Sequence, residues 1–354
     1  MPDGTPNSSA QGTAPRRRGG KPTRSQIAAT HAVVEWYLAK YFGTLDDQGV
    51  PRMFTERHRV GAFAINAAEW ARGRDTALFK FLVATAMFQR RQDVQVVRIL
   101  AGMRASDVAE IANPRRLLAL VDKGPCSLLR TNAALLERCD LSKDPATRQG
   151  CCAANPRESC HLKRHTVVLK RYGHFGKMPT SAALMLREAG ASGLNALRAQ
   201  ALRAHDSPLD RSRYLEQQLS AAWRINSKIA SMFLSALTNE DLAGPLACWK
   251  DGVDPSHFVV IDSNVDAFLT SIGYRGLGTY EARRAFVQAI AASIDLRAIN
   301  PALSSYNPRL VQQAMYLFMS ATNRRNIASD CMREGPASCR ACPRTVARRC
   351  PVRA

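Results

Sequence analysis

The stretch W-R-I-N-S-K-I-A-S-M-F-L, residues Trp223 to Leu234, joins a short turn directly to an apolar helix. Lys228 lies in the first turn of that helix, and the break before it runs from Arg224 to Ser227. Upstream, Ser207-Pro208 is typical of a helix start, because serine caps free N–H groups and proline suits the first helical position. The stretch therefore predicts two helices joined by a tight turn, a helical hairpin over about residues 208–236.

The rest of the chain carries a helical pattern as well. Apolar residues recur three and four positions apart, and almost no stretch alternates with a period of two. Amphipathic or apolar helices are expected over Ser25–Tyr41, Thr76–Met87 and Asp93–Leu100. A further helix is expected to begin at Pro179-Thr180-Ser181 and to run towards Gly190. The sequence therefore predicts an all-α fold.

A second landmark is F-V-V-I-D-S-N-V-D-A-F-L, residues Phe258 to Leu269. Its apolar run ends at Asp262, a natural N-cap for a helix that begins at Asn264. Taken alone, Asp262 could be only a helix cap, and Lys228 only a solvated surface charge. The order of the landmarks along the chain is what makes them informative.

The third landmark is a set of four cysteines near the C-terminus: Cys331, Cys339, Cys342 and Cys350, spaced C-x7-C-x2-C-x7-C. We expect no secretory signal at the start of the chain, and disulfides are uncommon in reducing compartments. Four thiols so close together therefore predict a metal ion or an iron-sulfur cluster. The spacing alone leaves both structural zinc and [4Fe-4S] open, because both are held by thiolates.

An irregular, cysteine-rich insertion is expected over residues 124–165. A second metal, zinc or an iron-sulfur centre, is one interpretation of its cysteines and histidines, and partly buried thiols are the other. The candidate ligands of this second site are Cys139, Cys151, Cys152, Cys160, His161 and His165.

The chain is strongly basic, with 354 residues and a formal net charge of +21. Such a charge indicates a polyanionic partner, and nucleic acid is favoured over a membrane surface. No stretch approaches the roughly 20 apolar residues that a spanning helix needs. Residues 1–25 are rich in Gly, Pro, Ser and Arg and are expected to form a disordered basic tail. We expect the protein to reside in the cytoplasm, associated with the nucleoid.

The order of lysine, aspartate and four cysteines resembles the helix-hairpin-helix DNA glycosylase superfamily, most closely its endonuclease III branch. The family's hairpin L-P-G-V-G-x-K-T-A is similar to A-W-R-I-N-S-K-I-A, which puts Lys228 in the position of the catalytic lysine. Its V-D-T-H aspartate falls on Asp262, and its C-x6-C-x2-C-x5-C cluster falls on the four C-terminal cysteines. A weaker match joins Leu78–Asp93 to the family's S-A-Q-x-x-D helix, with Gln89 in the place of the glutamine that enters the DNA stack.

The resemblance implies a two-domain fold with the chemistry in the cleft. Residues 76–239 would form a domain like a six-helix barrel, containing the insertion and the hairpin. Residues 26–75 together with 254–354 would form a second helical domain carrying a [4Fe-4S] cluster. The stretch between Lys228 and Asp262 is longer than in the family, and we expect it to be a surface elaboration between the domains.

The implied activity is base excision from double-stranded DNA that contains a damaged or modified base, followed by strand cleavage at the abasic site, by a monomeric protein. The implied catalytic residues are Lys228 and Asp262, and the implied DNA-binding residues are Gln89, Arg224, Asn226 and Ser227. Both family glycines of the hairpin are replaced, by Arg224 and Asn226. Asparagine tolerates a left-handed backbone, so Asn226 is expected to replace one glycine more easily than Arg224 does. The alternative is a catalytically silent or zinc-stabilised protein that binds damaged or modified DNA.

Overall fold

A computed structural model of the chain describes residues 20–43, 51–89, 92–124, 126, 129–139, 162 and 176–352. Within these ranges every regular element is a helix, so the all-α prediction is confirmed. None of the helices in the described ranges is long and apolar enough to cross a membrane. Most of the expected basic tail lies outside the described residues. The first helix begins at Arg24, where Thr23 caps it.

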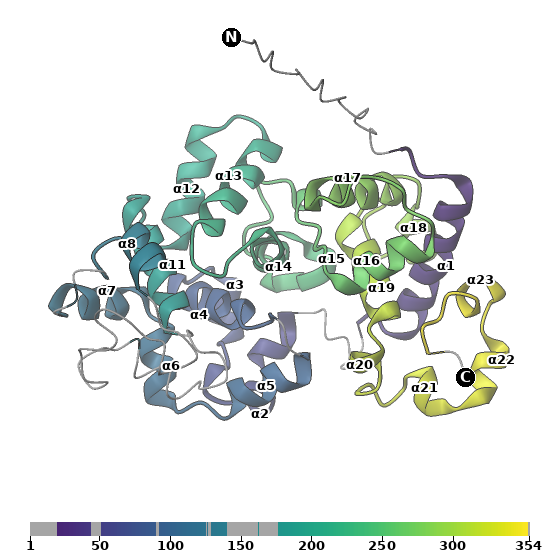
Figure 1. Cartoon of the computed structure of the whole chain (residues 1–354), viewed down its shortest axis with the longest axis horizontal. Helices are drawn as coiled ribbons and strands as arrows, with labels where there is room; N and C mark the ends of the chain where they lie inside the picture. Colours follow the sequence, from purple (N-terminus) through teal and green to yellow (C-terminus); the bar gives the residue numbers. More distant parts are fainter. Residues whose placement is uncertain are drawn as a thin grey trace, which may run out of the picture.

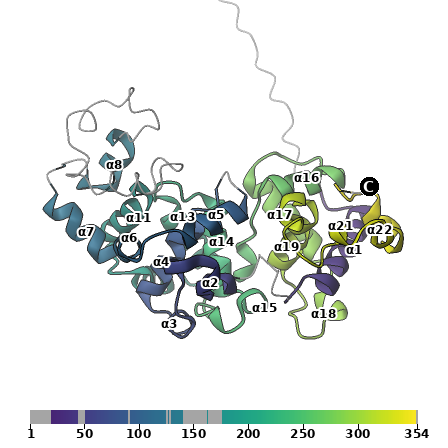
Figure 2. The same cartoon turned by 90° about the horizontal axis from the view of Figure 1, so that it is seen from below.

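The helices form two lobes (Figure 1), each built around its own apolar core. The first lobe contains η1 (Pro51–Thr55), α2 (Arg57–Val60), η2 (Gly61–Phe63), α3 (Ala67–Ala71), α4 (Asp75–Ala86), α5 (Asp93–Ala101), α6 (Ala105–Ile111), α7 (Pro114–Lys123), α8 (Asn132–Arg138), α11 (Lys177–Glu188), α12 (Leu194–Ala204), α13 (Pro208–Ser220), α14 (Ser227–Thr238), η7 (Gly244–Leu246) and η8 (Pro255–His257). The second lobe contains α1 (Arg24–Lys40), α16 (Ser263–Ser271), α17 (Tyr280–Ala291), α18 (Leu296–Ile299), α19 (Pro308–Met319), α20 (Ala321–Arg324), α21 (Cys331–Glu334), α22 (Pro336–Ala341) and α23 (Arg344–Ala347). The short helix α15 (Glu240–Ala243) lies between the lobes, next to α14 (Figure 2).

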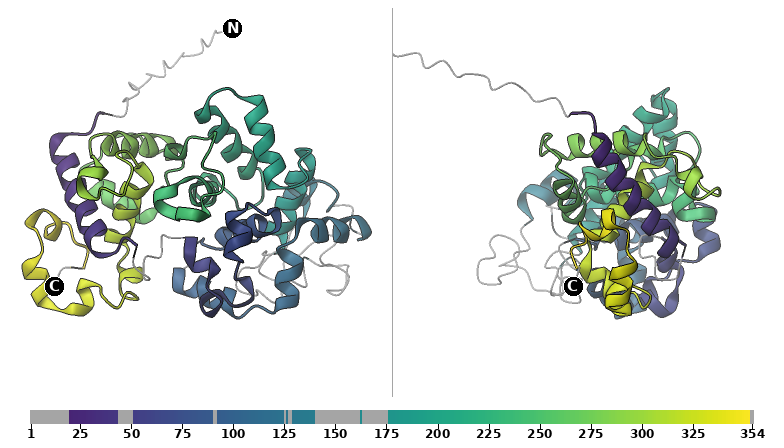
Figure 3. Two further views of the ribbon diagram at one scale, coloured as in Figure 1. Left: turned by 180° about the vertical axis from the view of Figure 1, so that it is seen from behind. Right: turned by 90° about the vertical axis from the view of Figure 1, so that its right-hand side faces the viewer.

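Each lobe is organised around a central helix. In the first lobe α14 packs against α4 and α13, and it buries Phe233 and Leu234 completely. In the second lobe α19 packs against α1, α16 and α17. The N-terminal helix α1 also contacts α23, so the first and last helices of the described chain lie side by side (Figure 3). Such apolar helices are stabilised mainly by this tertiary packing.

Two of the predictions about the organisation of the chain are wrong. Residues 51–75 were expected in the second domain, but Phe63 and Trp70 are fully buried in the core of the first lobe. The chain therefore passes from the second lobe to the first between residues 43 and 51. The helices that follow are too short to show a clear hydrophobic period, so the sequence pattern did not predict this change. The expected surface elaboration after α14 is also wrong, because Trp249 is 1% exposed and its Nε1 donates a hydrogen bond to Asn195 at 2.9 Å.

Of two predicted helix starts, one agrees with the structure and the other lies two residues too late. Ser207 caps α13 with Pro208 at the first helical position, as expected. Helix α11 begins at Lys177 rather than at the Pro179-Thr180-Ser181 start that we predicted. Proline is tolerated within the first turn of a helix, because the N–H group it removes has no partner inside the helix.

Part of the cysteine-rich insertion can be placed. Cys139 is buried in a small apolar cluster with Val121, Leu135 and Leu184. These surroundings are typical of a buried structural thiol. The other candidate ligands of a second metal lie outside the described residues: Cys151, Cys152, Cys160, His161 and His165.

Candidate functional site

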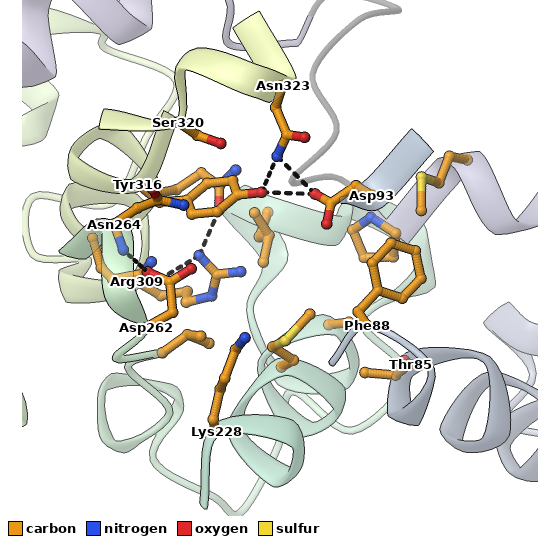
Figure 4. A pocket seen from close by; sticks show the side chains of 18 of the residues that line it. Thr85, Phe88, Asp93, Lys228, Asp262, Asn264, Arg309, Tyr316, Ser320 and Asn323 are labelled. Atoms are coloured by element: carbon orange, nitrogen blue, oxygen red, sulfur yellow. Dashed lines mark hydrogen bonds between the residues drawn. The ribbon is translucent and has the colours of Figure 1, made fainter. Parts of the chain in front are cut away.

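A cavity of about 620 Å³ lies between the two lobes (Figure 4), and it is lined by residues of both. Lys228 of the first lobe and Asp262 of the second line the same cavity. The two predicted catalytic residues are 34 positions apart in the chain, and the fold brings them to one site.

Lys228 owes its position to the start of α14. Asn226 caps this helix by accepting a hydrogen bond from the backbone N–H of Ile229 at 3.2 Å. Ile229 and Ala230 are fully buried in the first core, so this turn of the helix is fixed. Lys228 itself is half-buried, and in Figure 4 its side chain points into the cavity.

Asp262 is a helix cap that also faces the cavity. Its Oδ1 accepts hydrogen bonds from the N–H groups of Asn264 at 3.1 Å and Val265 at 2.9 Å, at the start of α16. The preceding apolar run is buried, with Phe258 and Val259 fully enclosed. The capping explanation and the catalytic one are therefore compatible, because a single carboxylate serves as cap and lines the cavity.

The cavity holds a second carboxylate that we did not single out from the sequence. Asp93, the first residue of α5, accepts hydrogen bonds from the Tyr316 hydroxyl at 2.6 Å and from the Asn323 amide at 2.9 Å. Burial raises the pKa of Asp93, while these two hydrogen bonds and the nearby Lys228 counteract part of that rise. The negative charge of Asp262 raises the pKa of Asp93 further, so both Lys228 and Asp262 lie within electrostatic range of Asp93.

Helix α19 supplies a polar wall that sequence reasoning also missed. Arg309, Gln312 and Gln313 are almost fully buried, yet they line the cavity together with Tyr316 and Ser320. Their spacing follows one face of a helix, at offsets of three and four residues. The Arg309 guanidinium donates hydrogen bonds to Gln312 at 2.6 Å and to Gln313 at 2.8 Å. This polar stripe on an otherwise apolar helix is the pattern that could have revealed the wall.

The hairpin turn contains one residue in the left-handed backbone conformation that glycine favours, and that residue is Arg224. Its φ of 65° is the only positive value at a non-glycine residue in the described ranges, whereas Asn226 has a φ of −98°. The expectation that Asn226 would take the left-handed position is therefore wrong. The Arg224 guanidinium lies over the ring of Trp223, 4.9 Å from its centre. This cation–π contact stabilises the residue in its strained conformation.

Neighbouring side chains hold the turn through its backbone. Gln89 donates from Nε2 to the carbonyl of Arg224 at 2.7 Å. Ser181 accepts from the N–H of Trp223 at 2.7 Å, and Asn132 donates to the carbonyl of Ala221 at 2.9 Å. Gln89 therefore lies at the hairpin and not among the residues that line the cavity.

A buried cluster of charged side chains connects the two lobes next to the start of α14. Glu216 of α13 pairs with Arg284 of α17 through two hydrogen bonds of 2.7 Å, and with His257 at 2.6 Å. All three side chains are buried. Although burial opposes the charged form, these partners and Ser227 hold the pKa of Glu216 at about 2. Ser227, an expected DNA-binding residue, thus contacts Glu216 at the base of the hairpin.

The four C-terminal cysteines lie on or directly beside three short helices, α21 to α23. Burial raises the pKa of the Cys342 thiol, and so do the negative charges of Cys331, Cys350 and Cys339. The buried Arg324 donates a hydrogen bond to the sulfur of Cys331 at 2.8 Å. Within the described ranges, no three ligating side chains are close enough together to hold a metal ion. The donor set itself, four cysteine thiols within residues 331–350, is of the chemical kind that binds an iron-sulfur cluster or zinc.

No protein-family model, curated protein or solved structure matches the chain.

Proposed function

We propose that the protein is a DNA glycosylase with abasic-site lyase activity, which excises a damaged or modified base from double-stranded DNA. One observation carries the proposal: Lys228 and Asp262, which lie in different lobes, line one cavity. A second supports it, because Lys228 follows a tight hairpin whose turn takes a left-handed backbone at Arg224. The helix-hairpin-helix glycosylases, which the sequence order resembles, combine these features with a C-terminal cysteine set.

The roles of the two residues follow from the chemistry at C1′ of deoxyribose. Positive charge develops on the sugar as the bond to the base weakens, and the Asp262 carboxylate stabilises that charge. Once deprotonated, the amine of Lys228 forms a bond to C1′ as the base departs with the bonding electrons and takes up the proton that Nζ loses. The sugar ring then opens, O4′ takes a proton from solvent, and a protonated Schiff base remains. Loss of a proton from C2′ expels the 3′ phosphate and cuts the strand.

The cavity suits a base that has left the duplex. A flipped base stacks against aromatic or apolar side chains and is recognised through its polar edge. The ring of Phe88 and the side chain of Met53 line one side of the cavity, and the polar stripe of α19 lines another. A volume of about 620 Å³ lies in the range of small-molecule sites.

The charge of the chain supports DNA as the partner. A net charge of +21 favours contacts with phosphates, which add affinity without sequence information. The exposed guanidinium of Arg224 at the hairpin is placed to make such a contact. The cysteine loop adds further arginines, of which all but Arg349 are exposed: Arg333, Arg340, Arg344, Arg348 and Arg349. The protein would act as a monomer on nucleoid DNA in the cytoplasm.

Four residues would hold the metal centre: Cys331, Cys339, Cys342 and Cys350. A [4Fe-4S] cluster bound there would act as a structural clip for the basic loop. Arg324 would support it, since it already donates hydrogen bonds to the sulfur atoms of Cys331 and Cys350 at 2.8 and 3.8 Å.

Borohydride trapping on an abasic-site duplex tests the proposal. The wild-type protein should form a covalent adduct with the DNA, because borohydride reduces the Schiff base to a stable amine. Lys228→Gln should form none. Lys250→Gln is the matched control, because Lys250 is an exposed lysine of the same lobe that lies outside the cavity. Equal trapping by Lys228→Gln would remove this lysine from the mechanism. Lesion binding without trapping or base release by the wild-type protein would instead support a catalytically silent DNA-binding protein.

A further inference from the structure

The cavity has two chemically different walls. The first lobe contributes mainly aromatic and apolar side chains, among them Phe54, Phe81 and Phe88. The opposite wall is polar and belongs largely to α19 and α20. A planar heterocycle stacked on the aromatic side would therefore present its hydrogen-bonding edge to the polar wall.

Asp93 is the polar group at the junction of the two walls. It belongs to the first lobe, but its partners Tyr316 and Asn323 belong to the second. Both hydrogen bonds end on the same carboxylate oxygen, Oδ2. The hydroxyl of Tyr316 also accepts a hydrogen bond from Asn323, which closes a triangle of three polar groups. Figure 4 shows the other oxygen of Asp93 pointing into the cavity.

The partners fix what Asp93 offers to a ligand. Because two donors bind Oδ2, the carboxylate cannot rotate freely, and Oδ1 remains directed at the cavity. An ionised carboxylate oxygen accepts hydrogen bonds and donates none. A base that turns an N–H group towards Oδ1 would be bound, and one that turns a carbonyl towards it would place two acceptors face to face.

We propose that Asp93 is the specificity-determining residue of this cavity and selects bases that carry an exocyclic amino group over counterparts with a carbonyl at the same position. The inference rests on the proposed glycosylase activity and deepens it by naming a substrate class. Pairing of a carboxylate with the amino group of cytosine is an established mode of base recognition. A mispaired buried acceptor changes the rate of base release by roughly 10- to 100-fold.

Asp93→Asn is the informative variant. The carboxamide oxygen can take the place of Oδ2 and keep both hydrogen bonds from Tyr316 and Asn323. Its NH₂ group then replaces Oδ1 and presents a donor to the cavity. The contact between the lobes is thereby retained while the polarity seen by the base is inverted. Tyr316→Phe is the matched control, because it weakens the triangle but leaves the Asp93 carboxylate in place.

The test measures single-turnover base release from duplexes that contain pairs of bases differing only in amino or carbonyl: 5-hydroxycytosine with 5-hydroxyuracil, 5-methylcytosine with thymine, and adenine with hypoxanthine. Cleavage of an abasic-site duplex, which offers no base, serves as the reference rate of each variant. The wild-type protein should release the amino member of at least one pair tenfold or more faster. Asp93→Asn should invert that ratio, and Tyr316→Phe should slow both members together.

Three results would overturn the assignment. They are equal release of both members by the wild-type protein, an Asp93→Asn variant that slows both without changing their ratio, and cleavage of abasic DNA without release of any base in the panel. Failure of the proposed function gives a different result, because the wild-type protein would then neither cleave nor be trapped on the abasic-site duplex.

Discussion

The buried ion pair between the lobes allows a quantitative prediction about the free energy of unfolding. Glu216 and Arg284 are 7% and 6% exposed and form a bidentate pair across the two lobes. Glu216→Gln preserves the shape of the side chain but removes its charge. Arg284 would then remain buried without its counter-ion, and its Nε already has no hydrogen-bond partner. The expected result is a large loss of unfolding free energy.

The magnitude follows from the pKa of Glu216. A decrease from the ordinary value of 4.5 to about 2 corresponds to ~3 kcal/mol of stabilisation at neutral pH. Removing one partner of a buried ion pair typically costs about 3 to 5 kcal/mol, so the two approaches agree. Because the folded pKa is depressed, this stability is fully present above the unfolded value of 4.5 and is lost as pH falls through about 2. The gap between wild type and variant should therefore stay constant from pH 7 to about 5 and narrow below that.

Urea unfolding followed by far-UV circular dichroism at several pH values measures this gap. Glu240→Gln is the control, because the Glu240–Lys250 pair is exposed and should contribute nothing measurable. The double variant Glu216→Gln/Arg284→Met should recover much of the loss, since no buried charge is then left unpaired. A Glu216→Gln protein as stable as wild type at pH 7, or a gap that widens on acidification, would refute the reasoning.

Three further predictions concern the site. Asp262→Asn should still bind an abasic-site duplex but release base about 100- to 1000-fold more slowly in single-turnover assays, because a group aligned with developing charge is lost; unchanged turnover would reduce Asp262 to a helix cap. Arg224→Gly should be about 1 kcal/mol more stable to urea than Arg224→Ala, since alanine keeps the strain at a φ of 65°; equal stabilities would contradict this. Protein purified without oxygen should contain iron and sulfide, which Cys342→Ala should lose and Cys248→Ala should keep, whereas zinc in place of iron would refute the [4Fe-4S] assignment.

The features that the sequence predicted well are local ones. The start of α13 at Pro208 and the cap of α16 at Asp262 each depend on a few adjacent residues, and both lie where their patterns placed them. The turn before α14 was also local, but its left-handed residue was misassigned. Intrinsic preference favoured Asn226, whereas the left-handed residue is Arg224, whose guanidinium stacks on Trp223.

The features that the sequence could not predict depend on distant partners. Asp93 and Tyr316 are separated by 223 positions. The motif match over Leu78–Asp93 ends on this aspartate, but it does not indicate its partners in the other lobe. The lobe assignment of residues 51–75 failed for a related reason. These residues form helices too short to show a period, and only packing of Phe63 and Trp70 reveals which core they join.

The polar stripe of α19 is the strongest physical reason to regard the cavity as functional. Arg309, Gln312 and Gln313 are 6%, 1% and 3% exposed on the central helix of the second lobe. Burying an amide or a guanidinium costs desolvation free energy that its hydrogen bonds only offset, and leucine at the same positions would avoid that cost. A helix selected only for packing would not place three such groups on the face that meets the other lobe. Local rules of this kind are broken mainly at functional sites. A base held between Phe88 and this stripe would turn its polar edge towards these groups.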